Sequence, residues 1–124
     1  MTKWVYLFLG GGAGTIARYV FSGWIYQGLG ARFPFGTLAV NLLGCFLIGF
    51  FAVLTEEKFL FPPELRVLVF AGFLGGFTTF STFIFETANL VRDGEGLLAL
   101  GNVLLSACAG FVVFRLGVLL AEVI

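Results

Sequence analysis

The segment from Gly72 to Phe83 has the most unusual chemistry in the chain. It reads GFLGGFTTFSTF, so two adjacent glycines precede four hydroxyl side chains inside an otherwise apolar run. Glycine and threonine are poor helix formers. A local unwinding would free backbone carbonyl groups, which a membrane tolerates only where they are buried in protein or line a cavity. Broken helices of this kind hold ions in transporters. The segment predicts such a break, and a continuous helix whose glycines serve packing is the alternative.

Most polar side chains within the apolar runs are hydrogen-bond donors. They are two amides and six hydroxyls: Asn41, Asn102, Thr37, Thr78, Thr79, Ser81, Thr82 and Ser106. Arg18 interrupts the first run, and Glu86 ends the third. A charge inside a membrane is a functional hypothesis by default, although an arginine near a helix end also snorkels to the surface. Donors plus an arginine, without an embedded carboxylate, favour an anion over a cation or a proton.

Small and polar residues recur at a spacing of four, which places them on one face of a helix. One row lies in the second run and one in the fourth: Thr37, Asn41, Cys45 and Gly49, then Asn102, Ser106 and Gly110. Two glycine pairs have the same spacing: Gly10 with Gly14, and Gly72 with Gly76. Such spacing lets membrane helices approach closely. These rows predict helix–helix contacts, with or without a functional role.

The elements that carry these residues are membrane spans. Of 124 residues, 60% are hydrophobic and only 11% are charged, whereas about 25% is usual for a soluble domain. This composition excludes both a soluble globular domain and disorder. Seven basic and seven acidic residues form no basic patch, so we expect no nucleic-acid partner. Cys45 and Cys108 sit in apolar runs and are predicted to be buried as small hydrophobic residues.

A membrane-crossing helix needs about 20 mainly apolar residues. The chain therefore predicts a single all-α membrane domain, 1–124, with four transmembrane helices at about 4–27, 35–54, 66–91 and 97–121. The break described above falls in the third. The N-terminal run has a basic start like a signal peptide, but the chain stays apolar afterwards, so we expect a retained first span. Function must then lie within the membrane or at helix–helix contacts.

The orientation of these spans is almost undetermined by charge. With four spans, one side holds Lys3, Lys58 and Arg66, and the other holds Arg32 and Arg92. Orientation follows the lysine and arginine residues of short loops, and three against two is a weak bias. Insertion in both orientations is one expectation, and a single poorly specified orientation is the other.

Two motifs resemble the Fluc (CrcB) family of bacterial fluoride channels. They are FGTLAVNLLG, which contains Asn41, and the segment from Gly72 to Phe83. The resemblance covers nearly the whole chain, including Arg18 in the first span. It implies an antiparallel, dual-topology homodimer in the bacterial inner membrane. Two pores per dimer would passively export fluoride from the cytoplasm and relieve its toxicity.

The resemblance also implies roles for particular residues. Asn41 would line the pore, and Phe80 and Phe83 would contact fluoride through ring edges, which carry the positive part of the aromatic quadrupole. A structural sodium ion at the dimer centre would be held by the backbone carbonyls of Gly75 and Thr78 from both subunits. Further residues would lie beside the pore or in its vestibule: Ser81, Thr82 and Ser106, then Arg18 and Glu86.

Two other classes compete with this interpretation. A small multidrug-type proton-coupled exporter has a similar size, but it needs a glutamate embedded in the first helix, where this chain has only Arg18. A structural or regulatory membrane subunit would give no ion flux. We expect no enzyme, because the chain has no histidine and no nucleophile–base constellation.

Overall fold

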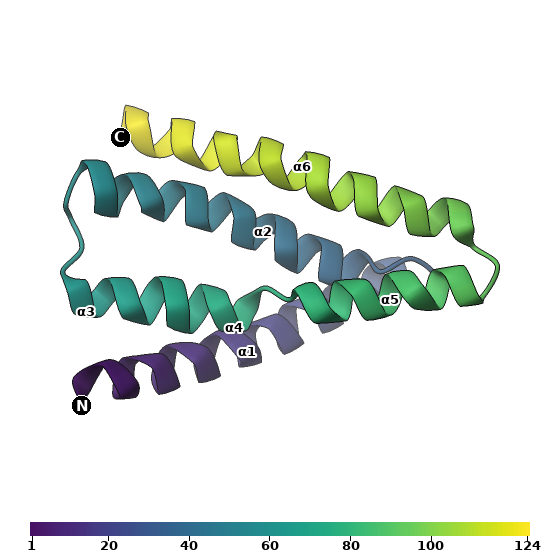
Figure 1. Cartoon of the computed structure of the whole chain (residues 1–124), viewed down its shortest axis with the longest axis horizontal. Coiled ribbons are helices and arrows are strands. Elements are labelled where there is room, and N and C mark those ends of the chain that lie inside the picture. The colour runs from purple at the N-terminus through teal and green to yellow at the C-terminus, as the bar shows by residue number, and fades with distance from the viewer.

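The computed structural model covers residues 1–124 and consists of helices joined by short links, without a strand (Figure 1). The predicted all-α class is therefore confirmed. The long helices are α1 (Thr2–Leu29), α2 (Phe35–Ala52) and α6 (Gly96–Val123). A π-helical turn, η1 (Val53–Glu57), extends α2. Between η1 and α6 lie α3 (Pro63–Arg66), η2 (Val67–Leu74, π-helical), α4 (Gly75–Phe77) and α5 (Phe80–Arg92).

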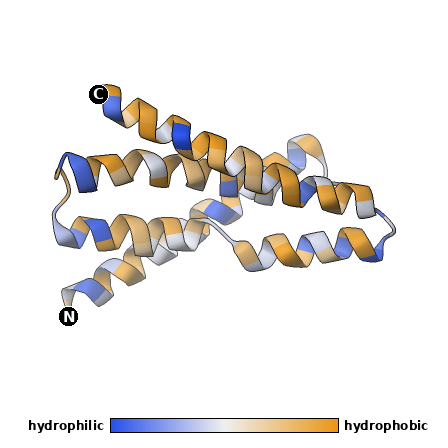
Figure 2. Cartoon of the chain, turned by 45° about the horizontal axis from the view of Figure 1, so that its top comes forward, coloured by the Kyte–Doolittle hydropathy of each residue, from blue (hydrophilic) through white to orange (hydrophobic).

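Three helical stretches are long and apolar enough to cross a membrane: Phe35–Glu57, Pro63–Arg92 and Gly96–Val123. Apolar residues follow their length in Figure 2. The 28 residues of α6 extend about 42 Å at 1.5 Å per residue, more than the hydrocarbon core of about 30 Å. The fold is thus that of an integral membrane protein.

The third apolar stretch is interrupted after α4. Thr78 has φ −86° and ψ 157°, and Thr79 has φ −151° and ψ 117°, so both residues are extended. Gly75 keeps helical angles, φ −62° and ψ −37°. The interruption therefore lies on the two threonines rather than on the glycines that precede them. In Figure 1 the extended link is visible between α4 and α5.

The paired glycines bring α1 against η2 and α4. A Cβ atom added at Gly10 would lie 3.1 Å from the Cα of Gly72, and one added at Gly76 would lie 2.6 Å from the carbonyl oxygen of Gly11. One added at Gly14 would collide with the carbonyl of Phe73. Only glycine permits this approach of backbone to backbone. The predicted contact faces are confirmed.

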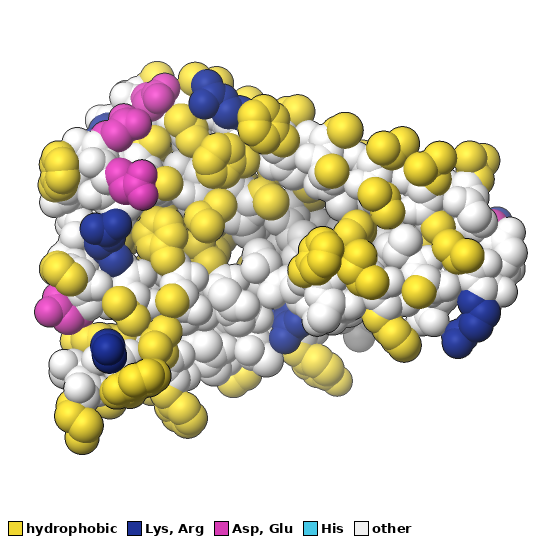
Figure 3. All heavy atoms as spheres, in the orientation of Figure 1, with side chains coloured by type: hydrophobic (Ala, Val, Ile, Leu, Met, Phe, Trp, Pro, Cys, Tyr) yellow, Lys and Arg dark blue, Asp and Glu magenta, His cyan; other side chains and the backbone are white.

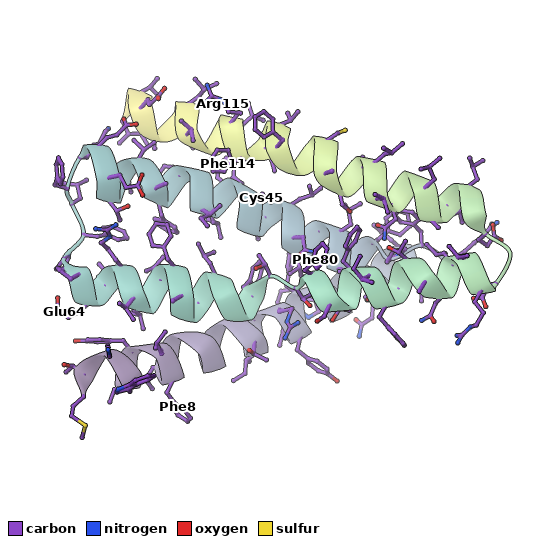
Figure 4. All side chains as sticks on the ribbon, in the orientation of Figure 1. Phe8, Cys45, Glu64, Phe80, Phe114 and Arg115 are labelled. Carbon is purple, nitrogen blue, oxygen red and sulfur yellow. The ribbon has the colours of Figure 1, made fainter.

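A second close contact joins α2 to α6. A Cβ at Gly49 would collide with the carbonyl of Phe114, and one at Gly117 with the carbonyl of Phe46. Figure 4 shows Phe114 directed from α6 towards α2. Next to this contact, Val53, Val118 and Ala121 form a small buried core. The row through Gly49 was predicted, whereas Gly117 was not singled out.

The outer surface of the chain is largely apolar. Figure 3 shows hydrophobic side chains over the visible face and charged side chains mainly towards the two ends of the bundle. Cys45 is half-buried, but Cys108 is exposed. The prediction that both thiols are buried is therefore wrong for Cys108, because this residue lies on the outer surface of α6.

Candidate functional site

Asn41 of α2 is fastened to the backbone of the extended link. Its Nδ2 donates to the carbonyl oxygen of Thr79 at 3.0 Å, and the Thr79 N–H donates to its Oδ1 at 2.8 Å. One side-chain amide thus satisfies both backbone groups of a residue outside the helical ladder, which buried backbone requires. One amide hydrogen of Asn41 is committed here, and one remains for another acceptor.

The threonines of the link add side-chain hydrogen bonds at the end of one helix and at the start of the next. The Thr78 N–H and hydroxyl both donate to the carbonyl of Leu74, at 3.0 and 2.9 Å. The Thr79 hydroxyl donates to the Thr82 hydroxyl at 3.0 Å and accepts from the Thr82 N–H at 3.3 Å, capping α5. A hydroxyl at the N-cap is the usual way to start a helix.

The extended link separates the carbonyl groups of residues 75–78 from their helical donors. The helical donor for the carbonyl of Gly75 would be the Thr79 N–H, which donates instead to Asn41. The donor for the carbonyl of Thr78 would be the Thr82 N–H, which donates instead to the Thr79 hydroxyl. Gly75 is also exposed on the chain. The carbonyl oxygens of Gly75 and Thr78 are therefore left without their helical partners, as are those of Gly76 and Phe77.

An open cavity of about 380 Å³ lies over the link. Its polar lining comes from Asn41, Thr78 and Thr79, and its apolar lining includes Phe80 and Cys45. Figure 4 shows Phe80 at the start of α5, beside the link, and Cys45 on α2. The cavity thus joins the two segments that the sequence motifs singled out.

Phe80 and Phe83 lie close together on α5, with ring centroids 5.7 Å apart and ring planes at 47°. Phe80 is 74% exposed on the single chain, although it is a large apolar side chain beside a polar link. Phe83 is half-buried, and Ser81 between them is exposed. The two rings therefore lie together, with Phe80 exposed at the cavity and Phe83 half-buried beside it.

Glu86 of α5 is held by side chains from two other helices. The Thr37 hydroxyl donates to its Oε1 at 2.7 Å, and the Tyr26 hydroxyl donates to its Oε2 at 3.0 Å. A second cavity, of about 200 Å³, brings Glu86 together with Arg18 and Thr82. Arg18 and Glu86 thus line one polar cavity.

The predicted row on α6 separates into three different environments. The Asn102 amide donates to the Thr87 hydroxyl at 2.8 Å and is turned to α5. The Ser106 hydroxyl is buried without a hydrogen-bond partner. Gly110 faces Cys45, whose sulfur would lie 3.5 Å from an added Cβ. Of the three, Ser106 alone has a polar group without any hydrogen-bond partner.

Sequence reasoning missed two polar partners, Tyr26 and Thr87. Tyr26 lies outside both motifs, and its hydrogen bond to Glu86 joins residues 60 positions apart. Thr87 follows Glu86 directly, and its spacing of four from Phe83 was a usable signal, because a threonine in a helix bonds readily to the carbonyl four residues earlier. No group of three or more His, Cys, Asp or Glu side chains forms a metal site.

The fold and the site define a class of helical membrane protein. In this class one apolar helical stretch is interrupted, and the residues at the interruption are polar. The model of the family described as "CrcB-like protein, Camphor Resistance (CrcB)" matches residues 5–118. The chain belongs to the CrcB family, as the two motifs indicated. It is a multi-pass membrane protein of a bacterial type.

Curated relatives cover almost the whole chain. A protein named "Fluoride-specific ion channel FluC" from Citrifermentans bemidjiense is 47% identical over 122 residues, which is 98% of either chain. Proteins of the same name from Geotalea uraniireducens and Maridesulfovibrio salexigens are 44% and 39% identical, covering 95% and 100% of this chain and 95% and 98% of their own. The alignments thus span nearly the whole length of both chains in each comparison.

Proposed function

We propose that the protein is a fluoride channel that passively exports fluoride from the cytoplasm and so relieves its toxicity. The observation that carries this proposal is the 47% identity over 98% of both chains to a fluoride-specific ion channel. The site supports it independently, because its side chains are donors and aromatic edges. A channel needs no chemical step, so the protein is not an enzyme.

The conduction pathway runs past Asn41, Phe80 and Phe83. Fluoride is small and strongly hydrated, so a dry pore must replace its water with donors. Asn41 offers one amide hydrogen, because the other is bonded to Thr79. The ring edges offer weaker positive potential, which lets an ion both enter and leave. The hydroxyls of Ser81, Thr82 and Ser106 assist, and the Ser106 hydroxyl has no competing partner within the chain.

Arg18 and Glu86 form the vestibule of this pathway. Both line the cavity of about 200 Å³ together with Thr82. Arg18 supplies positive charge that attracts an anion towards the pore. Glu86 would repel it, but its two carboxylate oxygens accept hydrogen bonds from Thr37 and Tyr26, which disperse part of its charge.

The functional unit is an antiparallel homodimer with two pores. In each subunit α1 also crosses the membrane, as the first of four spans, and the link at Thr78 and Thr79 lies near the membrane centre. The exposure of Phe80 and of the polar link supports this assembly, because lipid cannot satisfy free carbonyl groups. The near balance of loop charges supports insertion in both orientations. The dimer also covers the open cavity of about 380 Å³.

A structural sodium ion at the dimer interface fits the carbonyl oxygens of Gly75 and Thr78. Both have lost their helical donors, and carbonyl oxygens are ligands suited to a hard cation. When bound, the ion supplies positive charge that compensates these dipoles. The chain's own part is to hold the two carbonyls in place, through the bonds from Asn41 and from the Thr79 hydroxyl.

The test is fluoride efflux from liposomes that contain purified protein. Vesicles loaded with potassium fluoride should release fluoride after valinomycin is added, without ATP or a proton gradient, whereas chloride-loaded vesicles should release far less. A requirement for a proton gradient would replace the channel with a proton-coupled exporter. Absence of flux would favour a structural subunit.

A further inference from the structure

Asn102 is the most deeply buried large polar side chain of α6, with 1% of its surface exposed. Its Nδ2 donates to the Thr87 hydroxyl at 2.8 Å, and that hydroxyl donates to the carbonyl of Phe83 at 2.7 Å. A hydroxyl has one hydrogen to donate, so the direction of both bonds is defined. A continuous chain of two bonds leads from α6 to the backbone of a motif phenylalanine.

These two hydrogen bonds have a structural role in holding α5 in place. The helix α5 is only 13 residues long and is connected to α4 through the extended Thr78–Thr79 link, which transmits little stiffness. Lateral bonds must therefore fix its position and rotation. Asn41 bonds to Thr79 just before its first turn, and Asn102 bonds to Thr87 two turns later. The aromatic pair lies between the two asparagines.

Hydrogen bonding separates Asn102 from Ser106, which is proposed to meet the ion. It shares a helix face with Ser106 by spacing, but the structure directs its amide to Thr87, whereas the Ser106 hydroxyl has no partner. We propose that Asn102 is a positioning residue, which acts through Thr87 on the carbonyl of Phe83 and so sets the place of the Phe83 ring in the pathway. This inference rests on the proposed fluoride conduction.

The first test removes each bond with little change of shape. Asn102→Leu removes the donor, and Thr87→Val removes the hydroxyl. We expect either variant to lower fluoride efflux per assembled protein about tenfold, equivalent to about 1.4 kcal/mol. Thr87→Ser keeps the hydroxyl and should restore most of the flux. If Asn102→Leu fails to assemble, the comparison of Thr87→Val with Thr87→Ser decides alone.

The matched control is Thr55→Val. The hydroxyl of Thr55 donates to the carbonyl of Phe51, four residues earlier, at 3.0 Å, as Thr87 does to Phe83, but it lies in η1 at the end of α2. Loss of this bond should leave flux per assembled protein unchanged. Equal loss of flux in Thr55→Val and Thr87→Val would show a general effect of removing helix-bound hydroxyls and would overturn the proposal.

A double-mutant cycle distinguishes positioning from packing. If Asn102 acts through the ring, Asn102→Leu should have no further effect on flux once Phe83→Ile has removed the ring. Additive losses, or single variants that conduct like the wild type, would overturn the role of Asn102 while wild-type conduction still supports the channel. A wild-type protein without fluoride flux would overturn both proposals.

Discussion

The side chain of Asn41 and the backbone of Thr79 form two reciprocal hydrogen bonds, at 3.0 and 2.8 Å, between residues 38 positions apart. The amide of Asn41 takes the place that a neighbouring turn of helix would occupy. It therefore has two tasks, because it secures the interruption and still holds one free hydrogen. This dual use makes its replacement informative.

Asn41→Asp should give the lowest flux of all single variants. Aspartate still accepts from the Thr79 N–H, but it cannot donate to the Thr79 carbonyl, and its charge repels an anion. An unpaired buried polar group costs about 1–3 kcal/mol, so resistance to denaturation should fall as well. Liposome efflux and unfolding in detergent measure the two effects. Asn89→Asp on α5 is the control, and an equal loss there would remove any special role of Asn41.

Phe80→Ile and Phe83→Ile keep apolar bulk but remove the ring edges. Flux should fall about tenfold, equivalent to about 1.4 kcal/mol, while assembly is retained. Phe8→Ile is the matched control, because Phe8 is 78% exposed on α1, away from the link. Phe50, a phenylalanine of α2 outside both motifs, is a less suitable control, since it packs against the buried core. If all three variants conduct alike, the motif phenylalanines serve packing only.

Gly14→Ala should weaken the contact of α1 with η2. The added methyl group collides with the carbonyl of Phe73, and overpacking typically costs 1–3 kcal/mol, here about 2. Gly12→Ala lies half a turn away, where nothing stands within 4 Å of an added Cβ, so it should unfold like the wild type. Unfolding curves of the two proteins in detergent make the comparison. Identical curves would contradict the close contact.

Exchange of sodium for a much larger organic cation during purification should weaken activity or dimer stability. The carbonyls of Gly75 and Thr78 would then lose the ion that compensates them, and no side-chain substitution can imitate that loss. Efflux and the dimer fraction by size-exclusion chromatography are the measurements, with sodium restored as the control. Unchanged behaviour after verified removal of sodium would argue against the ion site.

Added lysines in one loop should select one orientation. Phe59 and Leu60 are exposed in the link between η1 and α3, so Phe59→Lys with Leu60→Lys biases one side. Leu29→Lys with Ala31→Lys biases the other. Each variant alone should be inactive, and co-expression should restore flux. Full activity of either variant by itself would exclude an antiparallel dimer.

Spacing within one helix predicted much of this structure, because it depends only on local geometry. The glycine pair of α1 and the pair shared by η2 and α4 were identified in this way. Partners between helices were harder to predict. Whether Thr37 meets Glu86, 49 residues away, depends on the relative rotation and height of two helices, which no local pattern contains.

The interruption shows the same limit at smaller scale. Its presence was indicated by composition, but glycine propensity drew attention to Gly75 and Gly76, which remain helical. Threonine was the better signal, because its hydroxyl can replace a lost backbone acceptor, as the Thr79 hydroxyl does for the Thr82 N–H. The exposure of Cys108 was unpredictable for another reason, since an apolar neighbourhood in the sequence does not distinguish a core from a lipid-facing surface.

The two chain ends lie at the same end of the bundle (Figure 1). Tags on both ends should therefore report the same side of the membrane in any one molecule. An even number of spans, with both ends on one side, also limits how two copies can be fused. Two copies joined in tandem by a short soluble linker would insert in parallel, so a single-chain antiparallel pair needs a connector that itself crosses the bilayer once.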